Sequence, residues 1–381
     1  MTKKIKIFII AGEASGDFLG AKLIAALKSI NPDIEFFGIA GPKMQQEAIT
    51  SLFPIEEISL FGFFEILPHL PKLIKLINYT IGSIKTIKPD LVITIDSPGF
   101  NFRIASKLQH ENIKLIHYVA PSVWAYKPKR AVKVALMYDL LLALLPFEPP
   151  YFEKENLKTI FVGHPVIENV IKYKKGAFRL NYNIGNDYKI IALTPGSRAQ
   201  EVKRLLPIFL GAAKLIKERI PKIVVVIIAT NNLVPLIQKL TNSNEALIVS
   251  EDQKYQLLSD TDLVIAKSGT NVLEIAMFNV PFIVGYKVNF LTAMLLKLMI
   301  KIPSVNLINI LGGTNIIPEF LQSYCTKESL AHAAYRLLTD SDSAKLQVEQ
   351  SKKQILKLET NIKPSMKAAL AVLSEIEQQN E

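Results

Sequence analysis

Two stretches with the same plan determine the fold: residues 5–17, IKIFIIAGEASGD, and residues 189–202, KIIALTPGSRAQEV. In each, a short apolar run ends in a glycine-containing turn that leads into a helical pattern. An unbroken apolar run is typical of a strand buried on both faces of a parallel sheet. Glycine permits the backbone conformations that a tight strand-to-helix turn requires. Each stretch therefore predicts the first strand and helix of a separate α/β domain.

More segments of the same kind follow both stretches. In the first half we predict strands at 36–40, 90–95, 113–119 and 140–145, with helices at 19–27 and 71–87. In the second half we predict strands at 223–229, 246–249, 262–266 and 281–284. Strands that alternate with helices indicate parallel sheets. We therefore expect two Rossmann-like, doubly wound domains, residues 1–170 and 171–355, that face each other across a ligand-binding cleft. A C-terminal helix over residues 356–381 completes the chain, and its return to the first domain stays open.

The composition excludes several classes of protein. With 49% hydrophobic and 21% charged residues, the chain is neither disordered nor fibrous. Its densest apolar runs are shorter than the roughly 18 residues that a spanning helix needs, and its first apolar run is too short for a signal peptide. The single cysteine, Cys325, excludes a disulfide framework and a cysteine-based metal site. These features predict a cytoplasmic protein.

The formal net charge of +11 indicates an anionic partner. Residues 66–89 and 275–318 contain no acidic residue and mix lysines with large apolar side chains. Basic residues among apolar ones fit a lipid surface better than a nucleic-acid groove, so we expect peripheral membrane binding and no nucleic acid. The alternative is that these segments are amphipathic core helices with solvated lysines.

The segment 60–68, LFGFFEILP, precedes the first acid-free helix. It has more large apolar groups than an ordinary loop, so we expect it to dip into lipid or to grip acyl chains. The residues predicted for this contact are Phe61, Phe63, Phe64, Leu67, Lys72 and Lys75. The alternative is that the aromatic side chains fill the core beneath the sheet.

Three loops of the first half carry polar groups directly after predicted strands. Residues 12–17, GEASGD, place glycines and a helix N-terminus where an anion could bind, or form a turn in which Ser15 or Asp17 caps the helix. Asp96, at the end of the third strand, is positioned as a general base, or caps the next helix. The loop 117–130 contains the only tryptophan, Trp124, and a basic cluster that could meet a phosphate or be solvated.

Two loops of the second half suit a phosphorylated ligand. Residues 195–198, PGSR, join a strand to a helix N-terminus and include Arg198, which can grip phosphate with two hydrogen bonds. Residues 267–270, KSGT, again precede a helix, and Glu274 one turn later can accept both hydroxyls of a ribose. The Asp-x-Asp pairs at 260–262 and 340–342 lie at a helix–strand junction and in a polar turn. We interpret both pairs as structural and expect no metal.

Together these motifs resemble the lipid-A-disaccharide synthase family, glycosyltransferases with two Rossmann domains. The matching strings lie at 12–17, 40–44, 96–101, 117–125, 145–148, 163–165, 195–202, 268–274 and 318–322. Three positions depart from the family pattern: Gly99 where a second acid is frequent, Tyr126 in place of tryptophan, and Ile308 in place of proline. The first departure leaves Asp96 as the sole acidic candidate in its loop. His164, in the string 163–165, has no partner at a suitable spacing and is interpreted as a hinge residue.

The resemblance implies an inverting, GT-B type hexosyltransferase without a cofactor. It would join UDP-2,3-diacylglucosamine to 2,3-diacylglucosamine 1-phosphate, giving the β-1,6-linked lipid A disaccharide 1-phosphate and UDP at the inner membrane. Asp96 would be the base, and Arg198 would meet the charge of the leaving UDP. Donor-binding residues would be Gly196, Ser197, Arg198, Glu201, Ser268, Gly269, Thr270, Glu274, Asn309, Glu319 and Gln322. Acceptor or loop residues would be Ser15, Gly16, Asp17, Asn101, Ser122, Trp124, Lys129 and Arg130; a role of residues 127–130 at the acceptor phosphate is our own inference.

Three alternatives belong to other classes. A related transferase for a lipid-linked acceptor would share the architecture, but the strings 96–101 and 117–125 argue against it. A UDP-sugar epimerase would need further acids and a histidine in the cleft. A non-enzymatic membrane- or RNA-binding protein would explain the charge but leave the phosphate-type loops without a role.

Overall fold

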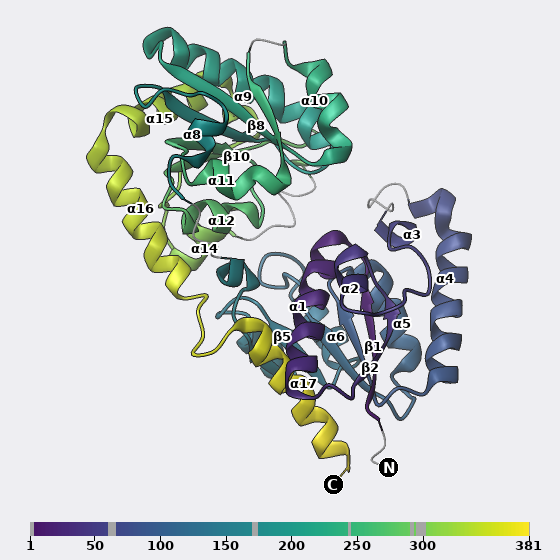
Figure 1. Ribbon diagram of the computed structural model, residues 1–381. Coiled ribbons are helices and arrows are strands. Elements are labelled where there is room, and N and C mark those ends of the chain that lie inside the picture. Colours follow the sequence, from purple (N-terminus) through teal and green to yellow (C-terminus); the bar gives the residue numbers. More distant parts are fainter. Residues whose placement is uncertain are drawn as a thin grey trace. The chain divides into compact units, whose positions relative to one another are not determined.

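The computed structural model describes residues 4–59, 66–169, 174–242, 245–289, 293–294 and 302–380. The chain forms two compact units (Figure 1). Unit 1 combines Met1–Glu168 with Leu358–Glu381, and unit 2 consists of Asn169–Lys357. Unit 1 is therefore assembled from two stretches of chain, with all of unit 2 between them in sequence.

Unit 1 is built on a six-stranded parallel sheet with the order β2-β1-β3-β4-β5-β6. Its strands are β1 (Lys6–Ala11), β2 (Glu35–Ile39), β3 (Leu91–Ile95), β4 (Lys114–Tyr118), β5 (Leu140–Ala143) and β6 (Lys158–Phe161). Its helices are α1 (Ala14–Ile30), α2 (Pro42–Gln46), α3 (Glu56–Ser59), α4 (Ile66–Ile87), α5 (Pro98–Leu108), α6 (Arg130–Ala135), α7 (Pro150–Glu153) and α17 (Pro364–Asn380). A 3₁₀ helix, η1 (Pro165–Asn169), follows β6. Because β1, β3 and β4 are direct neighbours, the loops that follow them emerge at one edge of the sheet.

Helices cover both faces of this sheet. Along β1, Ile7 and Ile9 pack into a core with α1 and α17, while Phe8 and Ile10 pack into a core with α4, α5 and α6. Figure 1 shows α17 beside α1, so the end of the chain packs against its beginning. Burial on both faces is the reason that these strands are continuous apolar runs.

Unit 2 contains a second six-stranded parallel sheet, with the order β12-β11-β10-β7-β8-β9. Its strands are β7 (Lys189–Thr194), β8 (Ile223–Ala229), β9 (Leu247–Ser250), β10 (Leu263–Ala266), β11 (Phe282–Tyr286) and β12 (Glu319–Leu321). Its helices are α8 (Ala177–Asn181), α9 (Ala199–Arg219), α10 (Val234–Leu240), α11 (Lys254–Leu258), α12 (Asn271–Met277), α14 (Leu307–Gly312), α15 (Lys327–Thr339) and α16 (Ser341–Leu356), with 3₁₀ helices η2 (Asn231–Leu233), η3 (Glu251–Gln253) and η4 (Gln322–Tyr324). One face is covered by α9, α10 and α15. Since β7 and β10 are paired in parallel, the loops after them also share an edge.

The two doubly wound parallel-sheet domains predicted from the sequence are confirmed. Strand β8 has the predicted bounds, whereas the edge strands β6 and β12 are not among the predicted elements. Both are short, and the pattern of β6 begins with an exposed residue, so neither shows the unbroken apolar run of a central strand. Helices α1 and α4 begin at Ala14 and Ile66, earlier than the predicted starts at 19 and 71.

Candidate functional site

The turn after β3 holds Asp96 in an unusual backbone conformation. Asp96 and Ser97 have φ values of +49° and +44°, so two consecutive non-glycine residues are left-handed. Such backbone costs on the order of 1–3 kcal/mol per residue and persists only where the surrounding structure enforces it. The buried Asn101 supplies part of that enforcement, because its Nδ2 donates to the carbonyls of Ile95 (3.1 Å) and Asp96 (2.8 Å).

Gly12, in the loop after β1, provides the space for this turn. A Cβ atom at Gly12 would lie 2.3 Å from Ser97 Oγ, which is closer than two non-bonded atoms can approach. The absence of a side chain at Gly12, in the loop after β1, therefore leaves room for the turn after β3. Ser97, and not Asp96, is the residue at the N-cap of α5, and no side chain accepts a capping hydrogen bond there.

The Asp96 carboxyl group is half-buried, and no cation pairs with it within the described part of the chain. Burial raises its pKa above the ordinary value, because the charged form loses solvation, while a hydrogen bond from the Ser97 backbone acts in the opposite direction. A carboxylate with a raised pKa and no ion-pair partner is a stronger proton acceptor than an exposed one. The turn therefore holds a carboxyl group with a raised pKa, and the role of Asp96 as the base stays a prediction.

In the loop 12–17, Asp17 and Gly16 are buried in contacts with other elements, whereas Ser15 is exposed. Asp17 is buried, and its carboxylate accepts hydrogen bonds from the backbone N–H groups of Lys43 and Met44, each at 2.9 Å. It therefore caps α2, not the helix on which it lies. Ser15 is exposed at the start of α1, and Gly16 is buried against β3, where a Cβ atom would lie 3.4 Å from the Ile95 carbonyl.

The loop after β4 contains an aromatic and a basic part. Trp124 is half-buried, with its ring edge-on to Phe147 at a centroid distance of 5.2 Å. Ser122 and Lys129 are exposed, and the Arg130 guanidinium lies over the Phe102 ring, 5.9 Å from its centroid. The predicted aromatic and basic side chains are thus on one loop, but with different degrees of exposure.

Glu148 is a buried acid that the sequence analysis does not place in the site. Its carboxyl group accepts from Trp124 Nε1 (3.3 Å) and from the backbone N–H groups of Leu144 and Leu145 (3.2 and 3.0 Å). Burial raises its pKa to about 7, more than these hydrogen bonds lower it. The string 145–148 indicates the residue, but burial depends on residues distant in sequence. Glu148 therefore positions the single tryptophan.

In unit 2, the loop after β7 is shaped by Gly196, which has a φ of +124°. A Cβ atom there would lie 2.3 Å from Glu201 Oε2. Glu201 in turn pairs with Lys267 Nζ at 3.1 Å and thereby joins this loop to the one after β10. Ser197 and Arg198 are exposed at the N-terminus of α9, so the Arg198 side chain is accessible to a ligand.

The loop after β10 is held by contacts across the edge of the sheet. Ser268 Oγ donates to the Val305 carbonyl at 2.6 Å, and Asn271 Nδ2 donates to Thr194 Oγ1 at 3.0 Å. Gly269 is half-buried and Thr270 is exposed. Their backbone lies directly before α12.

Glu274, predicted to hold a ribose, has protein partners for both carboxylate oxygens. Lys254 Nζ pairs with Oε2, and the Tyr255 hydroxyl donates to Oε1 at 2.6 Å. Lys254 is itself buried. A ribose could engage Glu274 only by exchanging one of these partners or by adding to them.

The buried Asn309 and the half-buried Glu319 form a hydrogen-bond network within unit 2. Asn309 Nδ2 donates to Glu319 Oε1 at 2.8 Å, and Glu319 also accepts from the backbone N–H groups of Val305 and Asn306, each at 3.0 Å. Their contacts hold the loop that Ser268 touches. Gln322 follows β12 with a φ of +52° and is half-buried.

The residues interpreted as structural have structural contacts. Asp260 accepts from the backbone N–H of Arg179 at 3.1 Å, and Asp262 accepts from Arg179 Nη2 at the same distance. Asp340 caps α16, with the backbone N–H of Ser343 donating to it at 3.0 Å. His164 is buried, and its backbone N–H donates to the Leu358 carbonyl at 3.2 Å.

The structure describes only part of the segment predicted to contact the membrane. Phe61, Phe63 and Phe64 lie outside the described residues, and Leu67 lies in α4 without a described side chain. Lys72 is exposed and pairs with Glu57, and Lys75 is exposed. Two further apolar side chains of α4, Leu70 and Ile74, are 39% and 47% exposed. No helix among the described residues combines the length and apolar character needed to cross a bilayer.

The contact between Glu148 and the single tryptophan can be tested by fluorescence. Because the pKa of Glu148 is raised to about 7, we expect Trp124 emission to change with pH with a midpoint near 7. The change should be absent in Glu148→Gln. Burial lowers the pKa of His117 to about 3 and that of His164 to about 4, so neither contributes in this range. A transition near pH 7 that survives in Glu148→Gln would contradict the assignment.

The raised pKa of Glu148 also predicts how the free energy of unfolding changes with pH. The folded chain binds the Glu148 proton more tightly than the unfolded chain, so this residue stabilises the fold fully below about pH 4.5 and loses that contribution as the pH rises through 7. Glu148→Gln should therefore flatten this part of the stability profile, measured by urea unfolding at several pH values.

Comparison with known proteins is consistent with these motifs. The family model described as lipid-A-disaccharide synthetase matches residues 7–373. The lipid-A-disaccharide synthase of Rickettsia bellii (strain OSU 85-389) is 42% identical over 381 residues, which cover 97% of this chain and 99% of the relative. That of Rickettsia canadensis (strain McKiel) is 44% identical over 379 residues, which cover 97% of each chain.

Solved structures share the fold at low sequence identity. A putative UDP-N-acetylglucosamine 2-epimerase from Listeria monocytogenes has a TM-score of 0.70 at 16% identity, and the match covers 100% of this chain and 97% of the other. The glycotransferase of kitacinnamycin has a TM-score of 0.62 at 14% identity and 99% coverage of both chains. The architecture thus occurs in epimerases and in glycosyltransferases, so fold alone does not separate these two classes.

The resemblance inferred from the motifs is confirmed by the extent of the match. The family model spans residues 7–373, and relatives at 42–44% identity cover 97% of the chain. The chain therefore belongs to the lipid-A-disaccharide synthase family.

Proposed function

We propose that this protein transfers a diacylglucosaminyl group from UDP to 2,3-diacylglucosamine 1-phosphate, forming the β-1,6-linked lipid A disaccharide 1-phosphate. The observation that carries the proposal is the left-handed turn that presents Asp96 without an ion-pair partner in the described structure, in a chain of this family. The experiment that tests it is mass spectrometry of the product formed by the purified protein from the two acylated sugars.

Asp96 is the general base of this reaction. Inversion at the anomeric carbon requires in-line attack by the acceptor 6-hydroxyl as the bond to UDP breaks, so one base must take the hydroxyl proton. The raised pKa of Asp96 strengthens it as proton acceptor. Asn101 fixes the turn through two backbone carbonyls and is therefore a positioning residue.

UDP is bound by unit 2. The exposed Arg198 and the backbone N–H groups at the N-terminus of α9 meet the diphosphate, and their positive charge stabilises UDP as it leaves. Gly196 leaves room for the Glu201 side chain behind this loop, and the loop 268–270 adds hydroxyl and N–H donors. Glu274 meets the ribose by exchanging one of its contacts with Lys254 and Tyr255 or by accepting a further hydrogen bond beside them.

The protein works at the inner leaflet of the cytoplasmic membrane as a peripheral protein. Both substrates carry acyl chains, and unit 1 exposes apolar side chains on α4 and just after α6. Leu70 and Leu136 are 39% and 72% exposed. Lysines on the same helices, including Lys75 and Lys133, are exposed and can meet anionic headgroups, each contributing about 1 kcal/mol.

Replacement of the base tests the chemical step. Asp96→Asn keeps the shape of the side chain but removes its proton-accepting form, so kcat should fall by about 10²–10⁴. UDP affinity, measured by calorimetry, should be unchanged because the donor contacts lie in unit 2. In the wild-type protein the acidic limb of the pH–rate profile should lie above the ordinary range of an aspartate, because burial raises the pKa. Retention of more than about a third of the turnover would contradict the role.

Replacement of the exposed arginine tests the donor site. Arg198→Ala should weaken UDP binding by about 1.5–3 kcal/mol, the range of a charge-assisted hydrogen bond. Lys203→Ala, an exposed cation on the next turn of α9, is the matched control and should bind UDP like the wild type. Activity that collapses with a chelator and returns with magnesium would instead assign the diphosphate charge to a metal.

Exposed leucines of unit 1 test membrane binding. The double variant Leu70→Ser with Leu136→Ser should weaken binding to anionic phospholipid vesicles about tenfold or more, measured by flotation. Its melting temperature should stay close to that of the wild type, because both side chains are exposed. The control is Leu180→Ser with Leu346→Ser, which removes leucines that are 76% and 55% exposed on unit 2. Equal flotation of both double variants would place the membrane surface elsewhere.

A further inference from the structure

A cavity of about 430 Å³ lies between α4, α5 and α6 of unit 1. Its apolar lining includes Ile77 and Phe102, with Ile74 and Met137 beside them. Ile77 is buried, Phe102 and Met137 are half-buried, and Ile74 is 47% exposed, so the cavity runs from the core to the surface. This volume falls in the range of about 300–1,000 Å³ that is usual for small-molecule sites.

Four cations surround this apolar cavity: Arg103, Lys107, Arg130 and Lys133. Helices α4, α5 and α6 contain no acidic residue, and none of the four cations forms an ion pair with a carboxylate among the described residues. Lys107 Nζ donates to Asn78 Oδ1 at 2.8 Å, and Arg130 lies over Phe102. An apolar cavity with unneutralised cations around it fits an amphiphile that has an acyl chain and an anionic group.

One of these cations connects the cavity to the turn that carries the base. The Arg103 guanidinium donates through Nη1 to the carbonyl of Gly99, in the first turn of α5. Gly99 is the third residue after Asp96. A phosphate bound by Arg103 would therefore lie near the start of α5, on the same side of the helix as the cavity.

We infer that this cavity holds one acyl chain of the acceptor, 2,3-diacylglucosamine 1-phosphate, with the phosphate bound by Arg103 and Arg130. The inference rests on the proposed function and adds a location for the acceptor. Val132 and Leu136, 42% and 72% exposed, add apolar surface to the segment that carries Arg130 and Lys133.

Filling the cavity tests the inference. Ser106 lines the cavity from α5 and is exposed, so Ser106→Phe adds a ring to the cavity without replacing a core residue. The matched control is Ser29→Phe, which adds the same ring to an exposed position near the end of α1. Activity is measured in neutral-detergent micelles, where attraction to a charged bilayer is absent, with acceptors that carry long acyl chains or acetyl groups. Ile74→Trp fills the same cavity from α4 and repeats the test if Ser106→Phe lowers the melting temperature.

The inference predicts that Ser106→Phe raises KM for the long-chain acceptor about tenfold or more. KM for the acetylated acceptor, UDP binding and vesicle flotation should stay within about twofold of the wild-type values, and Ser29→Phe should match the wild type throughout. An unchanged KM for the long-chain acceptor would overturn the inference, and loss of flotation alone would assign the cavity to a bilayer phospholipid. A wild-type protein that forms no disaccharide would overturn the proposed function itself, whereas an active wild type with an unaffected Ser106→Phe would overturn only the acyl-chain site.

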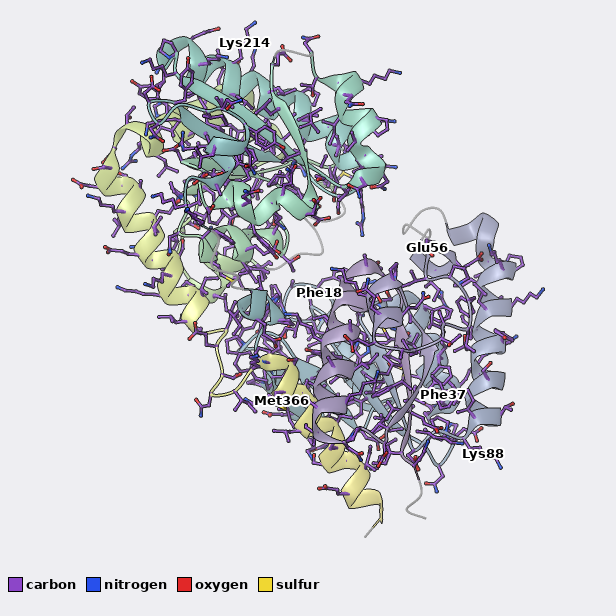
Figure 2. The ribbon with its side chains drawn as sticks, in the orientation of Figure 1. Phe18, Phe37, Glu56, Lys88, Lys214 and Met366 are labelled. Carbon is purple, nitrogen blue, oxygen red and sulfur yellow. The ribbon has the colours of Figure 1, made fainter. Side chains whose placement is uncertain are left out.

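The cations are tested separately. Arg103→Gln with Arg130→Gln removes the two cations assigned to the phosphate and should raise KM for the phosphorylated long-chain acceptor several-fold in the same micelles. The control, Lys214→Gln with Lys217→Gln, removes the same charge from two exposed positions of α9 and should leave this KM unchanged. Lys214 is labelled in Figure 2. Equal effects of the two double variants would show general electrostatic attraction and contradict a phosphate contact at the cavity.

Discussion

The close approach of Ser97 to Gly12 is the constraint on which the geometry of unit 1 depends. Parallel pairing places the ends of β1 and β3 side by side, and the turn after β3 must pass over the loop after β1. Only the missing Cβ of Gly12 leaves room for it. The space so created lets Asp96 and Ser97 adopt left-handed backbone, which directs the chain into α5 and leaves the Asp96 carboxyl group free of a helix-capping role.

In unit 2, different residues bring the loops after two neighbouring strands together. Gly196 leaves room for Glu201, and Glu201 binds Lys267, so the loops after β7 and β10 are tied together by an ion pair. In unit 1 the loops after β1 and β3 are in van der Waals contact at Gly12. In unit 2 the loops after β7 and β10 are joined by the ion pair between Glu201 and Lys267. The ion pair binds Lys267 to Glu201, whereas Arg198 at the same edge of the sheet is exposed.

The sequence was sufficient for the features that depend on local pattern. Continuous apolar runs predict the central strands, and glycine-containing turns after them predict the loops that hold Asp96 and Arg198. The contacts of Asp17 could not be predicted, because its partners Lys43 and Met44 are more than twenty residues away and belong to a short helix without a strong pattern. Glu148 is similar: the string 145–148 is recognisable, but its raised pKa comes from burial, which depends on the whole unit. The edge strands β6 and β12 also lack a signal, because half-exposed strands do not need continuous apolar residues.

The packing of α17 on α1 has a consequence for the order in which the protein is made. Residues of α17, including Ala368 and Val372, complete the core beneath α1, and Lys158 at the start of β6 pairs with Glu375 at 2.6 Å. Domains generally fold as units while the ribosome extends the chain from the N-terminus. The stretch Met1–Glu168 leaves the ribosome before unit 2 and lacks one side of its core until α17 has been synthesised, whereas unit 2 has all of its strands earlier. Unit 1 is therefore completed after unit 2, and until then it exposes the apolar surface of α1 that a chaperone would bind.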